Sequence, residues 1–120
     1  MKTVIKTEST AEFLTRGKTI ARSVDRGEPI PHERVIAFED PEDMARLITA
    51  AKLALFREVR NCPGSITELS ARLHRDRSAV KRDIDELERA GLIEIETKPH
   101  PGHGRKKEVR VVAEQVLLAI

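Results

Sequence analysis

Apolar and polar positions follow a helical period in two neighbouring segments near the middle of the chain. In the first, Ile66, Leu69 and Leu73 stand at i, i+3 and i+7, which predicts a short amphipathic helix. Ser65 and Glu68 have the spacing of a capping box, so we expect the helix to begin at Ser65. The apolar pattern stops at residues 74–76, where we predict a tight turn.

The second segment repeats the pattern with better-defined ends. Val80, Ile84 and Leu87 lie at i, i+4 and i+7. Either Asp76 or Ser78 is a suitable N-cap, and Gly91 is the residue expected just beyond the C-terminal end. Two short helices joined by a tight turn are therefore predicted between residues 65 and 91.

A strand pattern follows the second helix directly. Ile93, Ile95 and Thr97 alternate with charged residues, which is the period of a half-buried strand. Residues 99–104, PHPGHG, predict a loop. Val109 and Val111 alternate with charged residues again, so we expect the two strands to form a β-hairpin that packs beside the helix pair.

The N-terminal third contains simpler signals. A helix is expected from Ser9 or Thr10 to about Arg26, and a strand over residues 34–38, which would pair either with the hairpin or with residues 3–6. Residues 1–8 fit a short edge strand or a loose arm. One continuous helix is predicted from Pro41 to Arg60, capped by Asp40.

These elements predict an α+β protein, mainly α with a small β part. Its centre is a winged helix-turn-helix, preceded by an N-terminal helical extension. We divide the chain into an N-terminal arm, helix and strand for dimer or partner contacts (1–38), the winged helix-turn-helix (39–112) and an apolar tail (113–120).

Charge is unevenly placed although the net charge is only +2. With Val80 pointing inward, a rotation of ~100° per residue places Arg82 on the opposite side of the second helix. The N-terminal half of that outer side is basic and its C-terminal half is acidic. Residues 98–110 hold five Lys or Arg and one acid, Glu108. A solvated helix with ordinary ion pairs, such as Lys81 with Asp85, is the simpler alternative.

A helix that enters a DNA groove by its N-terminal end needs this order of charges, because only its first turns meet bases and phosphates. A basic hairpin tip suits a phosphate backbone. The candidate DNA contacts are Arg75, Arg77, Ser78, Lys81 and Arg82 from the second helix, Ser65 and Thr67 from the helix ends, and His103, Arg105, Lys106 and Lys107 from the hairpin.

The segment RDRSAVKRDIDELERAGLIEIE resembles the recognition helix and first wing strand of MarR-type winged-helix regulators. Residues 13–112 also resemble small prokaryotic DNA-binding proteins with the pattern SI-x-EL-x-A-RL-x-RD, which here spans residues 65–76. This resemblance implies a homodimeric repressor that binds double-stranded DNA, and an autoregulating antitoxin partnered by a toxin protein. The tail AEQVLLAI departs from it. The alternative is a winged-helix module whose main role is to bind a partner protein through residues 1–38 or the tail.

The amino-acid composition bears on the oligomeric state, on disulfides and zinc sites, and on the location of the protein. A chain of 120 residues with three Phe and no Trp or Tyr has a thin core, which favours burial in a homodimer. A single cysteine excludes an intramolecular disulfide and a cysteine-rich zinc site. Without a long apolar run, we expect a soluble, cytoplasmic protein with no membrane contact.

Catalysis is not expected. The four histidines are His32, His74, His100 and His103. His100 and His103 stand three apart in one loop with no adjacent acidic or thiol ligand, so no metal is predicted. Residues 16–19, RGKT, are similar to the last residues of a P-loop motif. The first glycine of that motif and the strand that precedes it are missing here. No cofactor and no enzyme activity are predicted.

Overall fold

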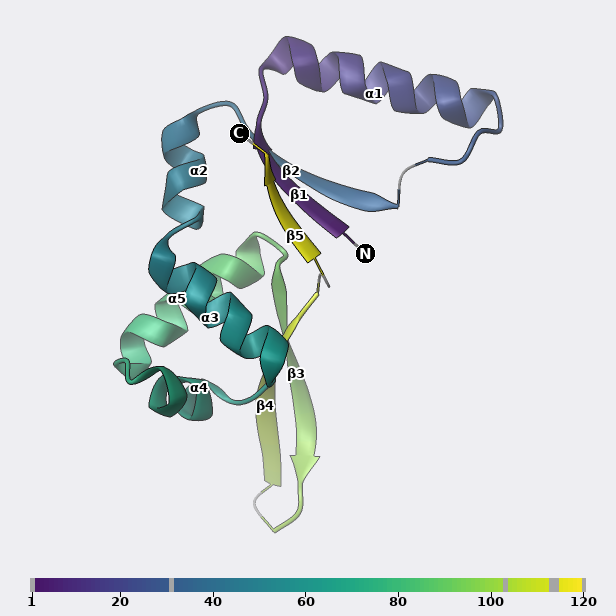
Figure 1. Ribbon diagram of the computed structural model, residues 1–120. Coiled ribbons are helices and arrows are strands. Elements are labelled where there is room, and N and C mark those ends of the chain that lie inside the picture. The colour runs from purple at the N-terminus through teal and green to yellow at the C-terminus, as the bar shows by residue number, and fades with distance from the viewer. Residues whose placement is uncertain (1, 31, 103, 113–114, 120) are drawn as a thin grey trace. The chain divides into compact units, whose positions relative to one another are not determined.

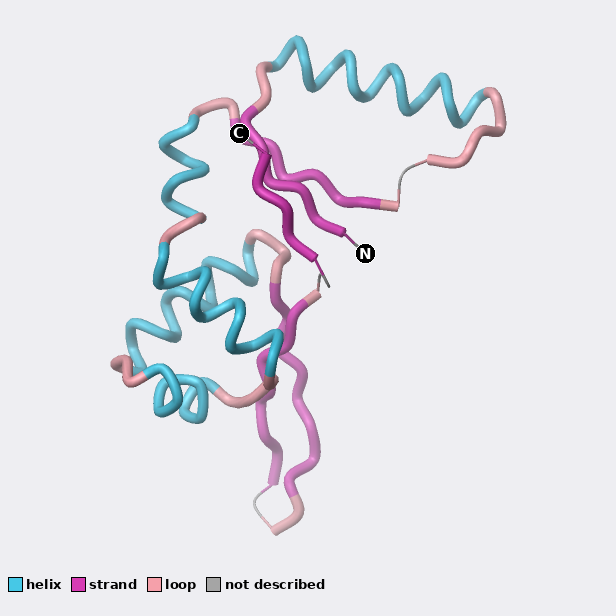
Figure 2. Tube along the Cα trace, in the orientation of Figure 1, coloured by secondary structure: helices cyan, strands magenta, loops and turns pink. Residues whose placement is uncertain are grey.

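The computed structural model describes residues 2–30, 32–102, 104–112 and 115–119. These residues form five helices and five strands in two compact units, Met1–Arg46 with Gln115–Ile120 (unit 1) and Leu47–Glu114 (unit 2) (Figures 1 and 2). The predicted α+β class is confirmed. Within the described ranges, every helix is too short or too polar to span a bilayer.

Three helices form the core of unit 2: α3 (Ala50–Asn61), α4 (Ile66–Leu73) and α5 (Arg77–Arg89). Their predicted apolar stripes face inward, since Leu69, Val80 and Ile84 are fully buried. The other buried apolar side chains of this unit are Leu55, Phe56, Val59, Leu87, Leu92, Ile93 and Val109. An ion pair also connects α3 to α5: the ammonium of the buried Lys52 pairs with the carboxylate of Glu86.

The turn between α4 and α5 is as tight as predicted. His74 adopts a left-handed conformation with φ of 53°. The amides of His74 and Arg75 donate to the carbonyls of Ala71 and Ser70, at 3.3 and 3.0 Å, which satisfies the last carbonyls of α4. Asp76 then caps α5, so of the two candidate caps Asp76 is the correct one.

The C-terminal end of α5 confirms the stop predicted at Gly91. Gly91 has φ of 76°, which a residue with a side chain rarely adopts. Its amide donates to Glu88, and the Leu92 amide donates to Leu87. Leu87 and Leu92 are both buried, so the turn leads directly into the hairpin.

The hairpin consists of β3 (Ile93–His100) and β4 (Gly104–Val111), paired antiparallel, and it extends beyond the helices (Figure 1). The predicted loop over residues 99–104 is wrong in extent, because pairing continues to His100 opposite Gly104. A two-stranded ribbon tolerates Pro99 in a strand, since a proline costs nothing where its nitrogen faces outward. Gly64, just before α4, forms a bridge with Val109, which fastens the hairpin to the start of α4.

Unit 1 contains a parallel sheet in the order β2–β1–β5. β1 (Lys2–Thr7) is its central strand, so the expectation of an edge strand or loose arm at residues 1–8 is wrong. The strand predicted over residues 34–38 is confirmed as β2 (Glu33–Phe38), and β1 is its partner. The apolar tail supplies β5 (Gln115–Ala119) on the other side of β1.

Helix α1 (Thr10–Asp25) connects β1 to β2, as predicted, with Ser9 as N-cap and Gly27 just beyond its end. The single helix predicted from Pro41 to Arg60 is wrong. The chain instead forms α2 (Pro41–Leu47) and α3, separated at residues 48–49. Thr49 explains the break, because its hydroxyl accepts the Lys52 amide at 3.2 Å and starts a new helix.

Candidate nucleic-acid interface

The outer side of α5 is open to solvent, whereas its apolar side is buried. Ser78, Lys81 and Arg82 are exposed, with 69% of the Arg82 side chain accessible. Together with Arg77 they line a shallow hollow of about 290 Å³, completed by Asp85 and Arg89. The structure therefore brings together four of the five residues that the sequence predicted on this helix.

The start of α5 is held by Asp76. Its carboxylate accepts the amides of Ser78 and Ala79 at 3.1 and 3.3 Å. A carboxylate here also suits the positive end of the helix dipole. Because the cap fixes where the helix begins, it also fixes which residues of the first turn point outward.

The first turn of α4 lies between α5 and the hairpin. The Arg77 Nε–H donates to the Thr67 hydroxyl at 3.2 Å. One residue further, Glu68 pairs with Lys106 of β4. The basic end of α5 and the basic hairpin thus both contact the first turn of α4, and we call the basic side chains of these two elements the cationic surface.

Glu68 introduces an acid into that surface. The Lys106 ammonium, assisted by the Ser65 hydroxyl, lowers the pKa of the Glu68 carboxyl against an opposing effect of burial. Glu68 is therefore ionised at neutral pH. The stabilisation from this pair is present above the ordinary glutamate pKa and is lost as the pH falls through the lower pKa of the folded state.

Ser65 is engaged in the same cap. Its hydroxyl accepts the Glu68 amide at 3.1 Å and lies 3.2 Å from the Glu68 carboxylate, as the capping box predicted. Ser65 is only partly exposed, while Thr67 is exposed. Of the two residues predicted at the helix ends, Thr67 is the more accessible to a ligand.

Arg75 differs from the other predicted residues. Its Nη2 donates to the Asp83 carboxylate at 2.8 Å, and the Asp83 side chain is only 7% exposed. Arg75 is absent from the residues that line the α5 hollow. Its position indicates that it neutralises a buried acid of α5 and holds the turn between the two helices.

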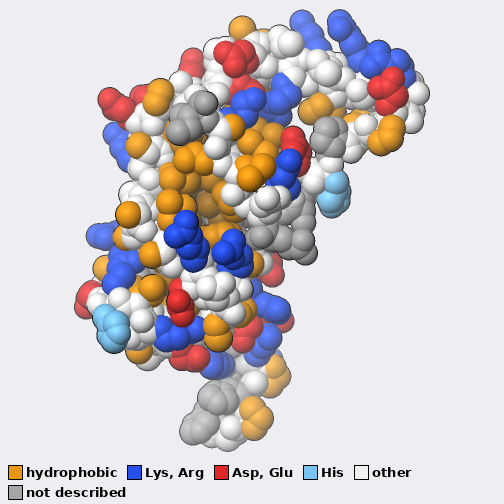
Figure 3. All heavy atoms as spheres, in the orientation of Figure 1, with side chains coloured by type: hydrophobic (Ala, Val, Ile, Leu, Met, Phe, Trp, Pro, Cys, Tyr) orange, Lys and Arg blue, Asp and Glu red, His pale blue; other side chains and the backbone are white. Residues whose placement is uncertain are grey.

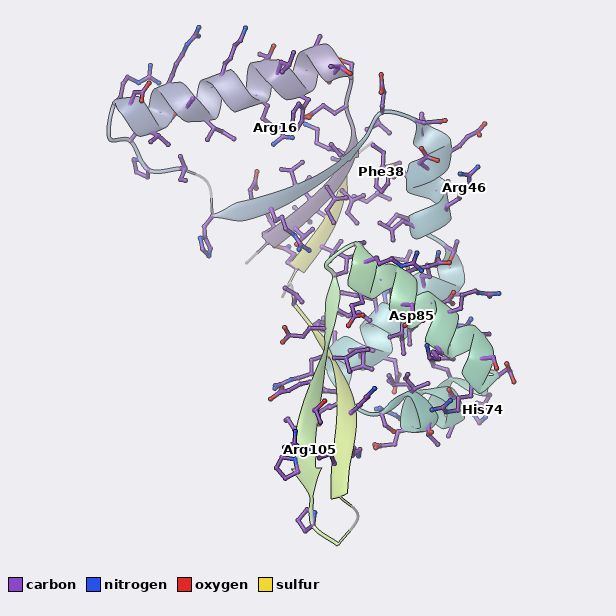
Figure 4. The ribbon with its side chains drawn as sticks, turned by 180° about the vertical axis from the view of Figure 1, so that it is seen from behind. Arg16, Phe38, Arg46, His74, Asp85 and Arg105 are labelled. Atoms are coloured by element: carbon purple, nitrogen blue, oxygen red, sulfur yellow. The ribbon has the colours of Figure 1, made fainter. Side chains whose placement is uncertain are left out.

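Ion pairs reduce the positive charge of the hairpin. Lys98 pairs with Glu108 at 3.1 Å, and Arg110 pairs with Glu96 at 2.9 Å. Lys and Arg side chains alternate with Asp and Glu over the face of this unit shown in Figure 3. Arg105 and Lys107 are exposed and form no ion pair with any described residue, so they are the cations available to a ligand. Figure 4 shows Arg105 on the distal part of the hairpin.

His103 lies outside the described residues, so its predicted contact has no structural account. In the part of the chain that the structure describes, no three His, Cys, Asp or Glu side chains gather as metal ligands. Glu68 was expected only as a capping residue. The helical rotation places Arg89 on the same outer side as Arg82, but Arg89 was not among the predicted contacts.

Unit 2 has the architecture of a winged helix-turn-helix: three helices, with α4 and α5 joined by a tight turn, followed by a hairpin wing. Residues 47–118, more than half of the chain, match the HVO_A0114 family. The protein belongs to this family. None of the curated proteins matches the sequence significantly.

Solved structures that are similar to the chain include the following two. A possible transcriptional regulator from Methanosarcina mazei Go1 shares 18% identity with a TM-score of 0.50, and the match covers 64% of this chain and 68% of the other. A MarR-like transcriptional regulator from Thermotoga maritima also shares 18% identity, with a TM-score of 0.46 over 88% of this chain and 66% of the other. At this identity the first structure supports the winged-helix fold alone.

Proposed function

We propose that this protein is a DNA-binding transcriptional regulator that recognises a specific sequence. The observation that carries the proposal is the arrangement around the first turn of α4. There Arg77 of α5 contacts Thr67, and Lys106 of the hairpin contacts Glu68. A helix that presents its basic end beside a basic wing has the two elements with which winged-helix proteins hold one duplex.

The charge order of α5 sets how it would enter the major groove. Its N-terminal half supplies Ser78, Lys81 and Arg82 as exposed donors to base edges and phosphates. Lys81 is paired with Asp85 at 3.0 Å in the free protein, so DNA competes for it with an acid. The acidic C-terminal half would be repelled by phosphates and stay at the groove edge.

The wing has a different task. Arg105 and Lys107 are exposed cations on a ribbon of two strands. Long side chains in such a position suit phosphates of the adjacent backbone, which add affinity without sequence preference. Lys106 would join them once a phosphate displaces Glu68.

The finer role that we propose is a homodimeric repressor, acting on a two-fold symmetric operator with half-sites ~34 Å apart. Residues 39–112 would carry the DNA contacts, and residues 1–38 would carry the dimer contacts. The sequence resemblance also supports an autoregulating antitoxin with a toxin partner. Repression of a reporter gene placed behind the selected operator tests this role, and unchanged reporter output contradicts it.

Selection of bound duplexes from a random DNA pool tests the function directly. We expect a palindromic consensus, and an affinity that falls ~10³-fold between about 50 and 200 mM salt if six or so phosphates are contacted. If no sequence is enriched at either salt concentration, the proposal of sequence-specific binding is contradicted. Salt-independent binding contradicts the cationic interface.

A further inference from the structure

The described residues of unit 1 bury few apolar side chains. Among the described residues, unit 1 contributes only Ile5 and Met44 to the buried apolar side chains. Parallel sheets normally have both faces covered by apolar packing. A unit with a three-stranded parallel sheet and so few buried apolar residues therefore needs more apolar contact than it makes by itself.

Helix α1 has its apolar stripe on its exposed side. Taking Gly17 as the centre, ~100° per residue places the stripe within about 60° of it. The stripe consists of Phe13, Leu14, Gly17, Ile20, Ala21 and Val24. All six are exposed, whereas the least exposed positions of the helix are the polar Arg16 and Ser23.

An ion pair explains this orientation. Arg16 extends from the side of α1 that faces the strands (Figure 4) and donates to the buried Glu8 carboxylate at 2.9 and 3.0 Å. The Arg16 guanidinium lowers the pKa of the Glu8 carboxyl, with a smaller contribution from Lys6. The helix is thus attached to its own unit by charge, and its apolar stripe remains available.

Nothing within the described part of the chain requires glycine at position 17, the centre of the stripe. A Cβ built there meets no atom within 4 Å, and no positive φ requires glycine at this position. Glycine weakens a helix interior, so its use needs another cause. Close approach of a second helix at this point would be such a cause, and Ala21, one turn further, has a similarly small side chain.

Beside the C-terminal half of α1 is a cleft of about 700 Å³ between α1 and β2, whose apolar lining is Ile20, Pro29, Ile30 and Val35. The large side chains Phe13 and Leu14 protrude from the N-terminal half, with 55% and 54% of their surface exposed. This cleft lies on the strand-facing side of α1, where Arg16, Thr19 and Ser23 also line it, and only Ile20 belongs to both the cleft and the stripe. The stripe itself is symmetric about Gly17, with Phe13 and Leu14 four and three residues before it and Ile20 and Ala21 three and four after it. Two copies related by a two-fold axis near Gly17 would pack each N-terminal half against the other's C-terminal half, as an isologous interface requires.

We infer that unit 1 is a dimerisation surface whose occupant is a second copy of this chain, with the two α1 helices packed antiparallel across Gly17. The apolar stripe exposes on the order of 400 Å² and is bordered by charged residues, while a standard interface buries roughly 800 Å² per partner. The polar residues that border the stripe would supply the remainder. This inference specifies the dimer of the proposed function and does not depend on its DNA contacts.

Sedimentation equilibrium of the full chain without DNA is the first test. The wild type should be dimeric, and Leu14→Glu should raise the dimer dissociation constant at least about tenfold. Thr15→Glu, on the opposite side of α1, is the matched control and should change it little. A monomeric wild type overturns the inference and leaves the cleft to a heterologous protein or a small ligand.

A disulfide test locates the surface independently of stability. In a Cys62→Ser background, Gly17→Cys should form a covalent dimer under mild oxidation, and Arg22→Cys, on the far side of α1, should not. The wild type could be dimeric while Leu14→Glu leaves the dimer dissociation constant unchanged and Gly17→Cys forms no covalent dimer. That result would show that the dimer uses another surface and would overturn the inference. A monomer that still selects a DNA consensus refutes the dimer and leaves DNA binding intact.

Discussion

At the scale of single residues, solvent exposure distinguishes the basic side chains that can contact DNA from those that stabilise the fold. Arg82 has 69% of its side chain accessible, against 54% for Lys81, and its ion-pair partner Asp83 is 3.9 Å away. Arg75 has the same charge but is committed to a buried acid. Similar residue types in neighbouring positions therefore have different expected effects when they are replaced.

Arg82→Ala should weaken binding to the selected operator by ~1–3 kcal/mol and relax its sequence preference at one position, because a base contact is lost. Fluorescence anisotropy on matched and mismatched duplexes measures both effects. Arg89→Ala, at the other end of the same hollow, is the control and should have a smaller effect. Equal losses for both variants would contradict entry of the helix by its N-terminal end.

Glu68→Gln should strengthen DNA binding. It removes a negative charge near the phosphates and releases Lys106, so affinity should rise by roughly 1 kcal/mol and the salt slope should steepen by ~0.9. Glutamine retains the capping box with Ser65 but loses the ion pair with Lys106, so the free energy of unfolding should fall by no more than about 1 kcal/mol. Glu88→Gln, an exposed acid at the far end of α5, serves as control. Weaker binding by Glu68→Gln would show that Glu68 has a positive role in recognition.

Arg75→Ala should destabilise unit 2 by about 2 kcal/mol, because the buried Asp83 carboxylate loses its hydrogen-bonded partner and retains only Arg82 at 3.9 Å. Urea unfolding measures the loss. Adding Asp83→Asn should recover part of it, since the unpaired charge is removed. If stability is unchanged while DNA affinity falls, Arg75 contacts DNA directly, as the sequence first suggested.

At the scale of elements, the wing and α5 contribute differently because of how each is held. α5 is fixed at both ends, by the Asp76 cap and by the turn at Gly91. The wing is fastened near its base through Gly64 and further out through Lys106, while Arg105 and Lys107 form no ion pair with any described residue. A rigid helix suits the recognition of base edges, and a projecting ribbon suits phosphate contacts.

Neutralising Arg105 and Lys107 together should weaken binding to all duplexes alike and reduce the salt slope by ~1.8, because two phosphate contacts are lost. Affinity measured across a salt series for operator and random duplexes tests this. Neutralising Lys98, which is paired with Glu108, should have a smaller effect. Loss confined to the operator would mean that the wing contacts bases.

Local signals predicted the ends of elements well. The caps at Ser9, Ser65 and Asp76 and the stops at Gly27 and Gly91 each depend on residues within one turn, and all are confirmed. The break at Thr49 was missed because the apolar period continues across it. There a hydroxyl cap prevails over a pattern that favours one helix.

At the scale of the whole molecule, contacts distant in sequence were the ones that no pattern revealed. β1 pairs with β5, so the first strand and the tail complete one sheet. Lys106 meets Glu68, and Arg75 meets Asp83, through the tertiary packing of α4, α5 and the hairpin. Charge counts along the sequence therefore overstated how many cations of the wing are available to a ligand.

The most direct test of the central claim is a titration of isotope-labelled protein with a selected duplex, followed by amide chemical shifts in NMR. We predict that signals from residues 65–68, 77–82 and 105–107 shift together at one stoichiometry, while those of α1 change little. Shifts confined to α1 or the parallel sheet, with α5 and the wing unaffected, would contradict the assignment of DNA binding to unit 2.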